Sequence, residues 1–506
     1  MTEPGAALPP DPTMEGDAEA PDAVGSVGPA GAPSWRTGEG WGTSRRATVA
    51  AWALFAVVAA WFAYGILHDD FRRYEVLGDS SSYLLQAESL GFAGHDLRYD
   101  QQDVDRFRAF RWADEPYGLY FQRSGDGWAF AKPYGYSVVL APFLRAFGPR
   151  YGVSLANLAL LAVLAALGTA TLRLRFRGAI VPLVLGVFLF GSPLVFYAHH
   201  LWVEVFWAPL VLAVLYATVR ACRDRSVWWG LAGAVLAALL LAEKAPALPL
   251  VAPVGVLALM RLGSWPRRAA VLGAFAVALL VAVVPYQQAS DGRAANPYGG
   301  QRYYARSYVP FDGERTPPVD GRGYGPVRSD ETFSVSYAVD ELGRDWGDKV
   351  ASGAYYVVGR HTGLLPFEPL ALFVVAAALV GIRRAGWTGR LVLVGLLGYV
   401  AFYVLLFPHN YNGGGQTLGN RYFLQVYPAV LVLAATARLR VKPLAVGAAV
   451  SAAAAWAFMS QHYTDAGHAI RDIDQTNPVQ RLLPFEGNQD GANYFRCGRN
   501  TCEDDG

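Results

Sequence analysis

Long apolar runs, separated by short charged turns, are the feature that most constrains this chain. A run of about 18 or more apolar residues can cross a bilayer as an α-helix. Only 17% of the residues are charged, against about a quarter in soluble domains. We therefore predict an all-α polytopic membrane protein with about eleven transmembrane helices. The runs are 48–67, 152–172, 178–197, 201–219, 227–242, 246–260, 268–286, 366–382, 391–408, 421–437 and 442–459.

Short basic turns predict the orientation of these helices. Arginine and lysine are enriched in cytoplasmic loops, and every basic cluster falls on one side if the N-terminus is cytoplasmic. We therefore expect a plasma (inner) membrane protein whose outer loops 68–151 and 287–365 and C-terminal tail 461–506 are extracytoplasmic. The clusters are Arg173, Arg175 and Arg177; Arg220, Arg223 and Arg225; Arg261, Arg267 and Arg268; Arg383, Arg384 and Arg390; and Arg438, Arg440 and Lys442.

The two ends of the chain differ from the apolar body, residues 46–460. Residues 1–45 are rich in Pro, Gly, Ala, Asp and Glu without an apolar period, which predicts a disordered cytoplasmic segment. The first apolar run begins too late for a cleaved signal peptide, so we expect it to act as a signal anchor. Cys222, in a basic turn, is expected to be a free thiol. An exported tail would favour a disulfide between Cys497 and Cys502.

Two segments of the first outer loop are predicted to be juxtamembrane helices. Residues 134–148 are apolar but shorter than a normal span, and a full crossing there would place the next basic cluster outside. We therefore interpret them as an interfacial or re-entrant helix. Asp79 and the three serines after it are typical of a helix N-terminus. Apolar residues then recur at helical spacing, which predicts an amphipathic helix on the membrane surface; they are Tyr83, Leu84, Ala87 and Leu90.

Asp79 is the acidic residue whose setting best suits catalysis. In one interpretation its carboxylate only caps the helix. In the other it serves as a general base, which must reach the proton that it removes. Asp69 and Asp70, nearer the first span, are the alternatives, whereas Glu88 lies on the same helix and is interpreted as a solvated residue.

Three cations are placed where an outer anionic group could be bound. Lys132, before Pro133, either extends to the interface or binds a lipid phosphate. Arg421 either grips a phosphate through two hydrogen bonds or anchors a helix at the interface. Lys244 is the third cation, and the alternative is that it pairs with Glu243.

Further polar residues lie near predicted outer ends of spans. Glu204 is an ionisable residue at membrane depth, which is costly and therefore suggests function. Its neighbours His199 and His200 point to different faces of a helix, so they do not form a convincing metal pair, and no metal ligand is assigned. The alternative is an interfacial cluster with Trp202 and Trp207. A glycine-rich segment contributes amides of the type that binds sugars but also forms turns: Asn410, Asn412 and Asn420.

Together these segments resemble the GT-C superfamily of polytopic glycosyltransferases, which take sugars from polyprenyl-phosphate carriers on the outer face of a membrane. GDSSSYLLQAESL looks like the acidic residue and helix of that family's first outer loop. AKPYGYSVVLAPFLRAFG looks like the lysine-proline stretch that closes the loop. EKAPALPLVAP and GNRYFLQVYP are similar to later family segments. The resemblance covers about 48–460, and each motif is short.

The resemblance implies a GT-C-like fold in which Asp79 is the base and Lys132, Lys244 and Arg421 bind the donor phosphate. Two departures concern the subfamily: Ser80 stands where many members have a second acid, and Tyr134 follows Pro133 where a second proline is usual. Residues with an expected substrate-binding role are Tyr83, Tyr134, His200, Glu204, Asn410 and Asn420.

The sequence thus predicts an inverting membrane glycosyltransferase with a lipid-linked sugar donor and an envelope glycan, glycolipid or protein acceptor. An Ala-, Gly- and Arg-rich composition is typical of high-GC bacteria such as actinobacteria, which favours a mannosyl or arabinosyl donor. Membrane lipids are the other expected partner; a net charge of +2 does not suggest nucleic acid. A divalent metal has no support in the sequence. The alternatives are a lipid or polysaccharide transporter or flippase and a non-catalytic envelope-assembly protein.

Overall fold

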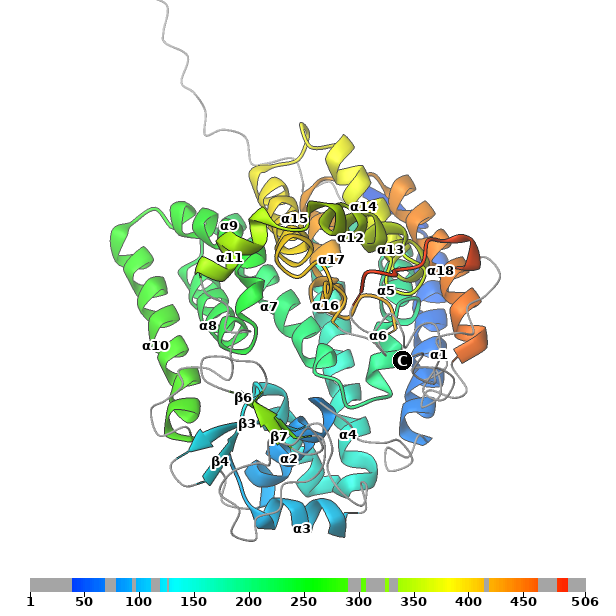
Figure 1. Ribbon diagram of the computed structural model, residues 1–506. Helices are drawn as coiled ribbons and strands as arrows, with labels where there is room; N and C mark the ends of the chain where they lie inside the picture. Colours follow the sequence, from blue (N-terminus) through cyan, green and yellow to red (C-terminus); the bar gives the residue numbers. More distant parts are fainter. Residues whose placement is uncertain are drawn as a thin grey trace, which may run out of the picture. The chain divides into compact units, whose positions relative to one another are not determined.

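Apolar helices make up most of the structure (Figure 1). The computed structural model describes residues 39–68, 79–92, 97–110, 119–124, 127–289, 302–305, 324–326, 335–413, 418–462 and 480–489. Among these, five helices are long and apolar enough to cross a membrane. The predicted mainly helical fold is confirmed, and the count of about eleven spans stays a prediction. The five helices are α1 (Arg45–His68), α4 (Gly135–Leu172), α7 (Glu204–Asp224), α10 (Trp265–Ala289) and α15 (Trp387–Leu406).

Shorter apolar helices account for the remaining predicted runs. Two runs are broken in the middle, at Pro193 and at Pro428, because proline lacks the N–H that a continuous helix requires. The shorter helices are α5 (Ile180–Phe190), α6 (Leu194–Ala198), α8 (Val227–Glu243), α9 (Leu248–Arg261), α14 (Pro369–Val380), α16 (Arg421–Val426), α17 (Ala429–Thr436) and α18 (Val441–His462).

The long helix α4 is two helices joined at a sharp kink. Gly148 interrupts it with φ 69° and ψ −179°, a backbone conformation that favours glycine. Gly152 lies so close to the preceding stretch that a Cβ there would be 2.8 Å from the Cα of Leu144. Residues eight apart in a straight helix are separated by about 12 Å, from the rise of 1.5 Å per residue. The chain therefore folds back at Gly148, which agrees with a separate helix over residues 134–148. That this helix does not span the membrane stays a prediction.

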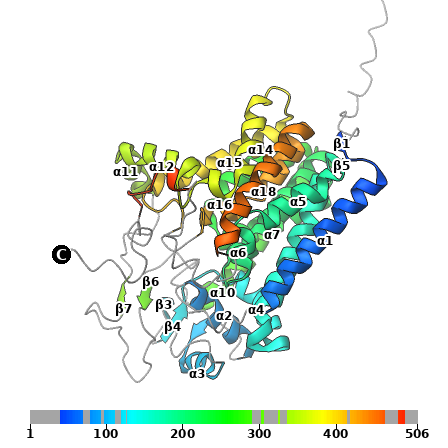
Figure 2. The ribbon, with the colours of Figure 1, turned by 90° about the vertical axis from the view of Figure 1, so that its right-hand side faces the viewer.

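A five-stranded antiparallel sheet joins the two predicted outer loops, in the order β2-β4-β3-β6-β7. The sheet lies with α2 (Asp79–Phe92) and α3 (Gln101–Ala109) at one end of the helices (Figures 1 and 2). The sequence analysis did not predict these strands. The strands are β2 (Arg98–Tyr99), β3 (Leu119–Ser124), β4 (Gly127–Phe130), β6 (Arg302–Ala305) and β7 (Tyr324–Pro326).

Helix α2 is buried on all sides, so the predicted amphipathic surface helix is wrong. It packs against α4, α3 and β3. Its polar side chains bond inward: Ser80 Oγ donates to the carbonyl of Leu201 at 2.8 Å, and Gln86 Nε2 donates to that of Lys132 at 2.9 Å. Glu88, interpreted as solvated, is 0% exposed. The serines and the glutamine contact other segments of the chain. The spacing of apolar residues along the helix cannot predict such contacts.

The remaining short elements lie between the apolar helices or in the predicted terminal segments. β1 (Glu39–Trp41) pairs in parallel with β5 (Phe176–Gly178), so the last part of the segment predicted to be disordered forms a strand. Residues 1–38, Asp69, Asp70, Cys497 and Cys502 lie outside the described residues. Cys222 is a free, buried thiol on α7, as predicted. The other elements are α11 (Val335–Gly343), α12 (Trp346–Val358), α13 (Leu364–Phe367) and the 3₁₀ helices η3 (Ala245–Ala247) and η5 (Gln480–Leu482).

The fold-back of α4 predicts unequal effects of two glycine substitutions. Gly152→Ala should lower the free energy of unfolding by about 1–3 kcal/mol, the usual cost of overpacking, because its Cβ would meet backbone atoms of Leu144. Gly255→Ala on α9 meets nothing within 4 Å and should be neutral or stabilising. Unfolding of the purified proteins in mixed micelles with rising dodecyl sulfate measures both. Equal stability of the two variants would contradict the close packing at Gly152.

Candidate functional site

Asp79, the first residue of α2, binds two cations that come from distant parts of the chain. Its Oδ1 lies 2.6 Å from the Nζ of Lys132, and its Oδ2 accepts a hydrogen bond of 2.7 Å from a terminal nitrogen of Arg421. The side chains of these three residues are 18%, 10% and 11% exposed, so the cluster is nearly but not fully closed to solvent. The sequence analysis predicted these three residues as a base and two phosphate ligands, and the structure brings them together.

Arg421 also binds Glu204, so that it bridges two carboxylates. Its Nε donates to Glu204 Oε1 at 2.6 Å, and the same oxygen accepts from Gln425 Nε2 at 3.1 Å. Glu204 is 0% exposed. The planar guanidinium suits this arrangement because its donors point in fixed, different directions. A lysine in its place would offer one point charge and could not hold both carboxylates in this geometry.

Aromatic rings surround the three cations. Tyr120 lies 4.0 Å below the Nζ of Lys132, and Trp202 lies 4.4 Å from the guanidinium carbon of Arg421. Such contacts contribute about 0.5–2 kcal/mol each and exclude water from the charges. Trp202 and Trp207 therefore line the charged cluster, in place of the interfacial belt that the alternative interpretation gave them.

Lys244 is the third cation, and among the described residues it has aromatic rings rather than a carboxylate as its nearest neighbours. Its Nζ lies near the rings of Tyr422 at 4.4 Å, Trp207 at 5.0 Å and Tyr403 at 5.8 Å. No carboxylate in the described part of the chain forms an ion pair with it. The adjacent Glu243 instead accepts a hydrogen bond of 2.9 Å from the backbone N–H of Gly135. The alternative interpretation, in which Lys244 pairs with Glu243, is therefore wrong. The cluster thus holds three basic and two acidic side chains.

Helix breaks place the two residues that face each other across the cluster. Asn420 Oδ1 caps α16 by accepting the N–H of Phe423 at 2.9 Å, which sets Arg421 at the first position of that helix. Between α6 and α7 the backbone is irregular, and buried Asn157 bonds the carbonyls of Ala198 and His200 that the break frees, at 3.0 and 2.9 Å. Glu204 begins the next helix, α7. Irregular backbone of this kind is tolerated at depth only where it is satisfied inside the protein.

The surroundings shift the pKa of Asp79 and of Lys244 in the same direction. Burial would raise the pKa of Asp79, but the charges of Lys132 and Arg421 outweigh it and hold this pKa well below its usual range. Burial first, and then the charge of Arg421, lowers the pKa of Lys244 to about 7. In the free site, Asp79 is therefore ionised and a weak base, and Lys244 titrates near neutral pH.

Most of the other residues predicted to bind substrate make packing contacts or hydrogen bonds within the protein. Tyr83 packs edge-on against Tyr136 at 5.9 Å, and Tyr134 donates from its hydroxyl to the carbonyl of Ala282 at 2.9 Å. His200 lies in the break before α7 and stacks near Phe196 at 4.7 Å. Asn420 acts as a helix cap through its oxygen, while its buried Nδ2 has no acceptor in the described residues. Asn410 lies in the turn after α15, with a buried side-chain oxygen that likewise lacks a donor there.

Gln425 and three of the rings in the site were not predicted from the sequence: Tyr120, Tyr403 and Tyr422. Gln425 follows Arg421 by one helical turn, so it lies on the same face of α16, and this spacing was the available signal. These three rings come from β3, α15 and α16, and no local pattern in the sequence connects these segments. The described residues contain no cluster of three or more His, Cys, Asp or Glu side chains suited to a metal ion.

Comparisons with protein-family models, with curated proteins and with solved structures each return no match. The case for a function therefore depends on the geometry and charges of this cluster.

The burial of the Arg421 ion pairs predicts a large effect when the arginine is removed. Arg421→Met should lower the free energy of unfolding by about 3–5 kcal/mol, because buried Glu204 loses its ion-pair partner and Asp79 keeps only Lys132. The matched control is Arg220→Met: Arg220 pairs with Asp224 at the same 2.6 Å, but both side chains are about 30% exposed, and exposed pairs contribute about 0–1 kcal/mol. Unfolding in mixed micelles compares them. Equal losses in the two variants would rule out a tightly coupled buried network.

Proposed function

We propose that the protein is an inverting membrane glycosyltransferase that moves a sugar from a polyprenyl-phosphate carrier to an envelope acceptor on the outer face of the membrane. The proposal includes the cytoplasmic N-terminus, the extracytoplasmic site and about eleven spans. Asp79 is the base, and Lys132, Arg421 and Lys244 bind the donor phosphate. It rests on the cluster and on the resemblance of the surrounding segments to GT-C enzymes.

The observation that supports this most is the convergence of Asp79, Lys132 and Arg421 within hydrogen-bonding distance, with the unbalanced charge of Lys244 nearby. An excess of one positive charge in a nearly closed, ring-lined site suits a single negative charge, such as that of a phosphodiester. A non-catalytic assembly protein would not require these residues to meet. A transporter would be expected to carry ionisable groups through the bilayer midplane and broken helices in matching halves of the chain. The proposal instead places this cluster at one face of the membrane.

In the proposed reaction the acceptor hydroxyl attacks the anomeric carbon of the donor sugar. The new glycosidic C–O bond forms as the bond between that carbon and the phosphate oxygen breaks. The bonding electrons leave with the polyprenyl phosphate, and the hydroxyl proton passes to the carboxylate of Asp79. Preorganised cations stabilise the charge that develops on the leaving phosphate.

The low pKa of Asp79 makes donor binding a condition for base catalysis. In the free site Lys132 and Arg421 donate hydrogen bonds to the carboxylate of Asp79. A bound phosphate competes for the same donors, which weakens their hold on Asp79 and raises its pKa toward the range of an effective base. Glu204 and Gln425 would keep Arg421 in position during this exchange. We therefore expect the donor to bind before the acceptor is activated.

Asp79→Asn tests the base directly. The amide keeps the size of the side chain but cannot accept a proton, so turnover of a polyprenyl-phosphate mannose or arabinose should fall by about 10²–10⁴-fold. Affinity for a short-chain polyprenyl phosphate should hold or increase, because a competing carboxylate charge is lost.

Asp105→Asn is the matched control, since Asp105 lies in the same outer loop with a side chain that is 62% exposed. Its turnover should stay within twofold of the unsubstituted protein. Near-normal turnover in Asp79→Asn would reject Asp79 as the base and return attention to Asp69, Asp70 and Glu204.

The titration of Lys244 predicts how donor affinity depends on pH. The anion binds the protonated lysine, so affinity should be full below a pKa of about 7 and decline by roughly tenfold per pH unit above it, until the pKa of the bound form is reached. A prenyl phosphodiester keeps one negative charge between about pH 6 and 9 and is the suitable ligand for calorimetry. Lys244→Arg should flatten the profile, because arginine stays charged. The same slope in that variant would assign the titration to another group.

A further inference from the structure

The C-terminal segment Arg481–Gln489 docks onto the outer turns of the helical body. Arg360, at the end of α12, donates from its backbone N–H to the carbonyl of Pro484 at 3.0 Å. Its guanidinium donates to the carbonyls of Arg481 and Leu483 at 2.9 and 3.0 Å. This segment is separated from Arg360 by more than a hundred residues, so it acts as a tether between distant parts of the chain.

Glu486 is the buried centre of this docked segment. It is 0% exposed, and its Oε1 accepts three hydrogen bonds: from the N–H groups of His361 and Thr362 at 2.8 and 2.9 Å and from the Thr362 hydroxyl at 3.1 Å. The same hydroxyl lies 2.7 Å from that of Tyr411. The hydrogen bonds therefore lead from Glu486 into the turn that follows α15.

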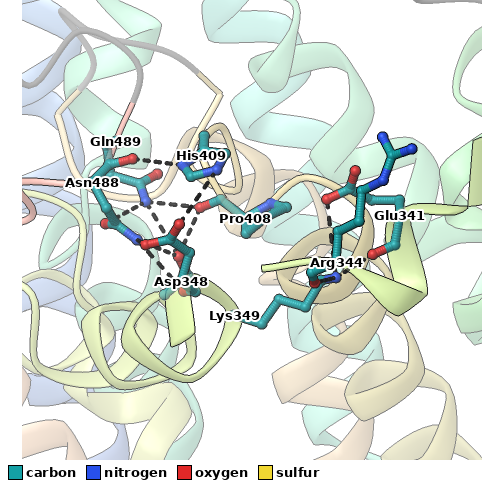
Figure 3. Close-up of polar contacts among 9 residues, drawn as sticks. Glu341, Arg344, Asp348, Lys349, Pro408, His409, Asn488 and Gln489 are labelled. Carbon is teal, nitrogen blue, oxygen red and sulfur yellow. Dashed lines mark hydrogen bonds and ion pairs between the residues drawn. The ribbon is translucent and has the colours of Figure 1, made fainter. Parts of the chain in front are cut away.

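Asn488 and Gln489 hold the start of that turn. Gln489 Nε2 donates to the carbonyl of Pro408 at 2.8 Å, and the Nδ1 of His409 donates to the carbonyl of Asn488 at 2.9 Å. Figure 3 shows Asn488 and Gln489 beside Pro408 and His409. Ser352 on α12 donates to the same carbonyl at 2.7 Å. The turn is thus held from two sides.

The same turn reaches Arg421. Gly413 has φ 94°, and a Cβ there would lie 3.1 Å from the Cβ and 3.2 Å from the Cδ of Arg421. Its backbone therefore packs directly on the aliphatic stem of the arginine. A shift of this turn changes the packing against the aliphatic part of Arg421. It therefore also changes the orientation of the guanidinium toward Asp79 and Glu204.

We infer that Glu486 and Gln489 are positioning residues for Arg421, which they hold through residues Pro408–Gly413. They touch none of the reacting groups. That Glu486 and Gln489 affect phosphate binding rests on the proposed function. That they hold the turn Pro408–Gly413 does not. The contacts form a continuous physical path from the C-terminal segment to the charged cluster.

Hydrogen exchange of the full chain tests the first half of the inference. Glu486→Ala should speed exchange of the backbone N–H groups in 409–413 and 421–426 at least tenfold, and Gln489→Ala should act in the same direction. Glu486→Gln keeps the accepting oxygen and should restore protection. Leu482→Ala is the matched control in the same segment, where the side chain is 84% exposed. Unchanged exchange at 409–413 and 421–426 in Glu486→Ala would overturn the inference.

Binding of a short-chain prenyl monophosphate tests whether the path acts through Arg421. Glu486→Ala should weaken binding about tenfold in the unsubstituted chain and in Lys132→Ala, but by less than twofold in Arg421→Ala. An equal loss in the Arg421→Ala background would overturn the positioning role. If exchange responds as expected but the unsubstituted protein does not bind the ligand, the inference about the turn stands and the proposed function falls.

Discussion

The bridge that Arg421 forms between Asp79 and Glu204 is the interaction on which the arrangement of the site depends. A charge removed from water is costly unless it is paired and hydrogen-bonded. The guanidinium can satisfy both carboxylates only if α2, the start of α7 and the start of α16 meet at one point. The helix breaks before Glu204 and Arg421 allow this meeting, because they place each side chain at a helix end rather than along a continuous span. The network therefore links residues 79–132 to the last third of the chain.

The same network explains why the free site is better suited to binding an anion than to removing a proton. Asp79 is bound by two cations, which lowers its pKa and makes it a poor proton acceptor. Lys244 has rings around it and no carboxylate partner in the described residues. An incoming phosphate would neutralise the excess charge and compete for the cations that hold Asp79. Binding and activation would then be one event, so a carboxylate with a low pKa in the free protein is compatible with a role as base.

The sequence predicted the parts of this protein that depend on local pattern. Apolar runs gave the helical body, and the short run 134–148 gave a separate helix because it could not span a membrane. Asp79, Lys132 and Arg421 were found because each stands at the edge of an apolar segment. By contrast, the buried state of α2 and Glu88 depends on partners from α4 and β3. The strands were missed although Leu119–Gln122 and Trp128–Phe130 flank a Gly-Asp-Gly turn sequence, which is a signal for a hairpin.

The sheet couples the two predicted outer loops to each other, and this bears on how the site could respond to substrates. Strand β3 of residues 68–151 pairs with β6 of residues 287–365, and Lys132 follows β4 of the same sheet. On another side, the C-terminal segment holds the turn that supports Arg421. The two cations that bind Asp79 are thus supported by different structures, one by the sheet and one by the docked segment. A ligand that orders the sheet would change the geometry of the Lys132–Asp79 ion pair alone, and one that orders the docked segment would change that of the Arg421–Asp79 ion pair alone. Donor and acceptor could therefore act on the carboxylate of Asp79 through separate supports.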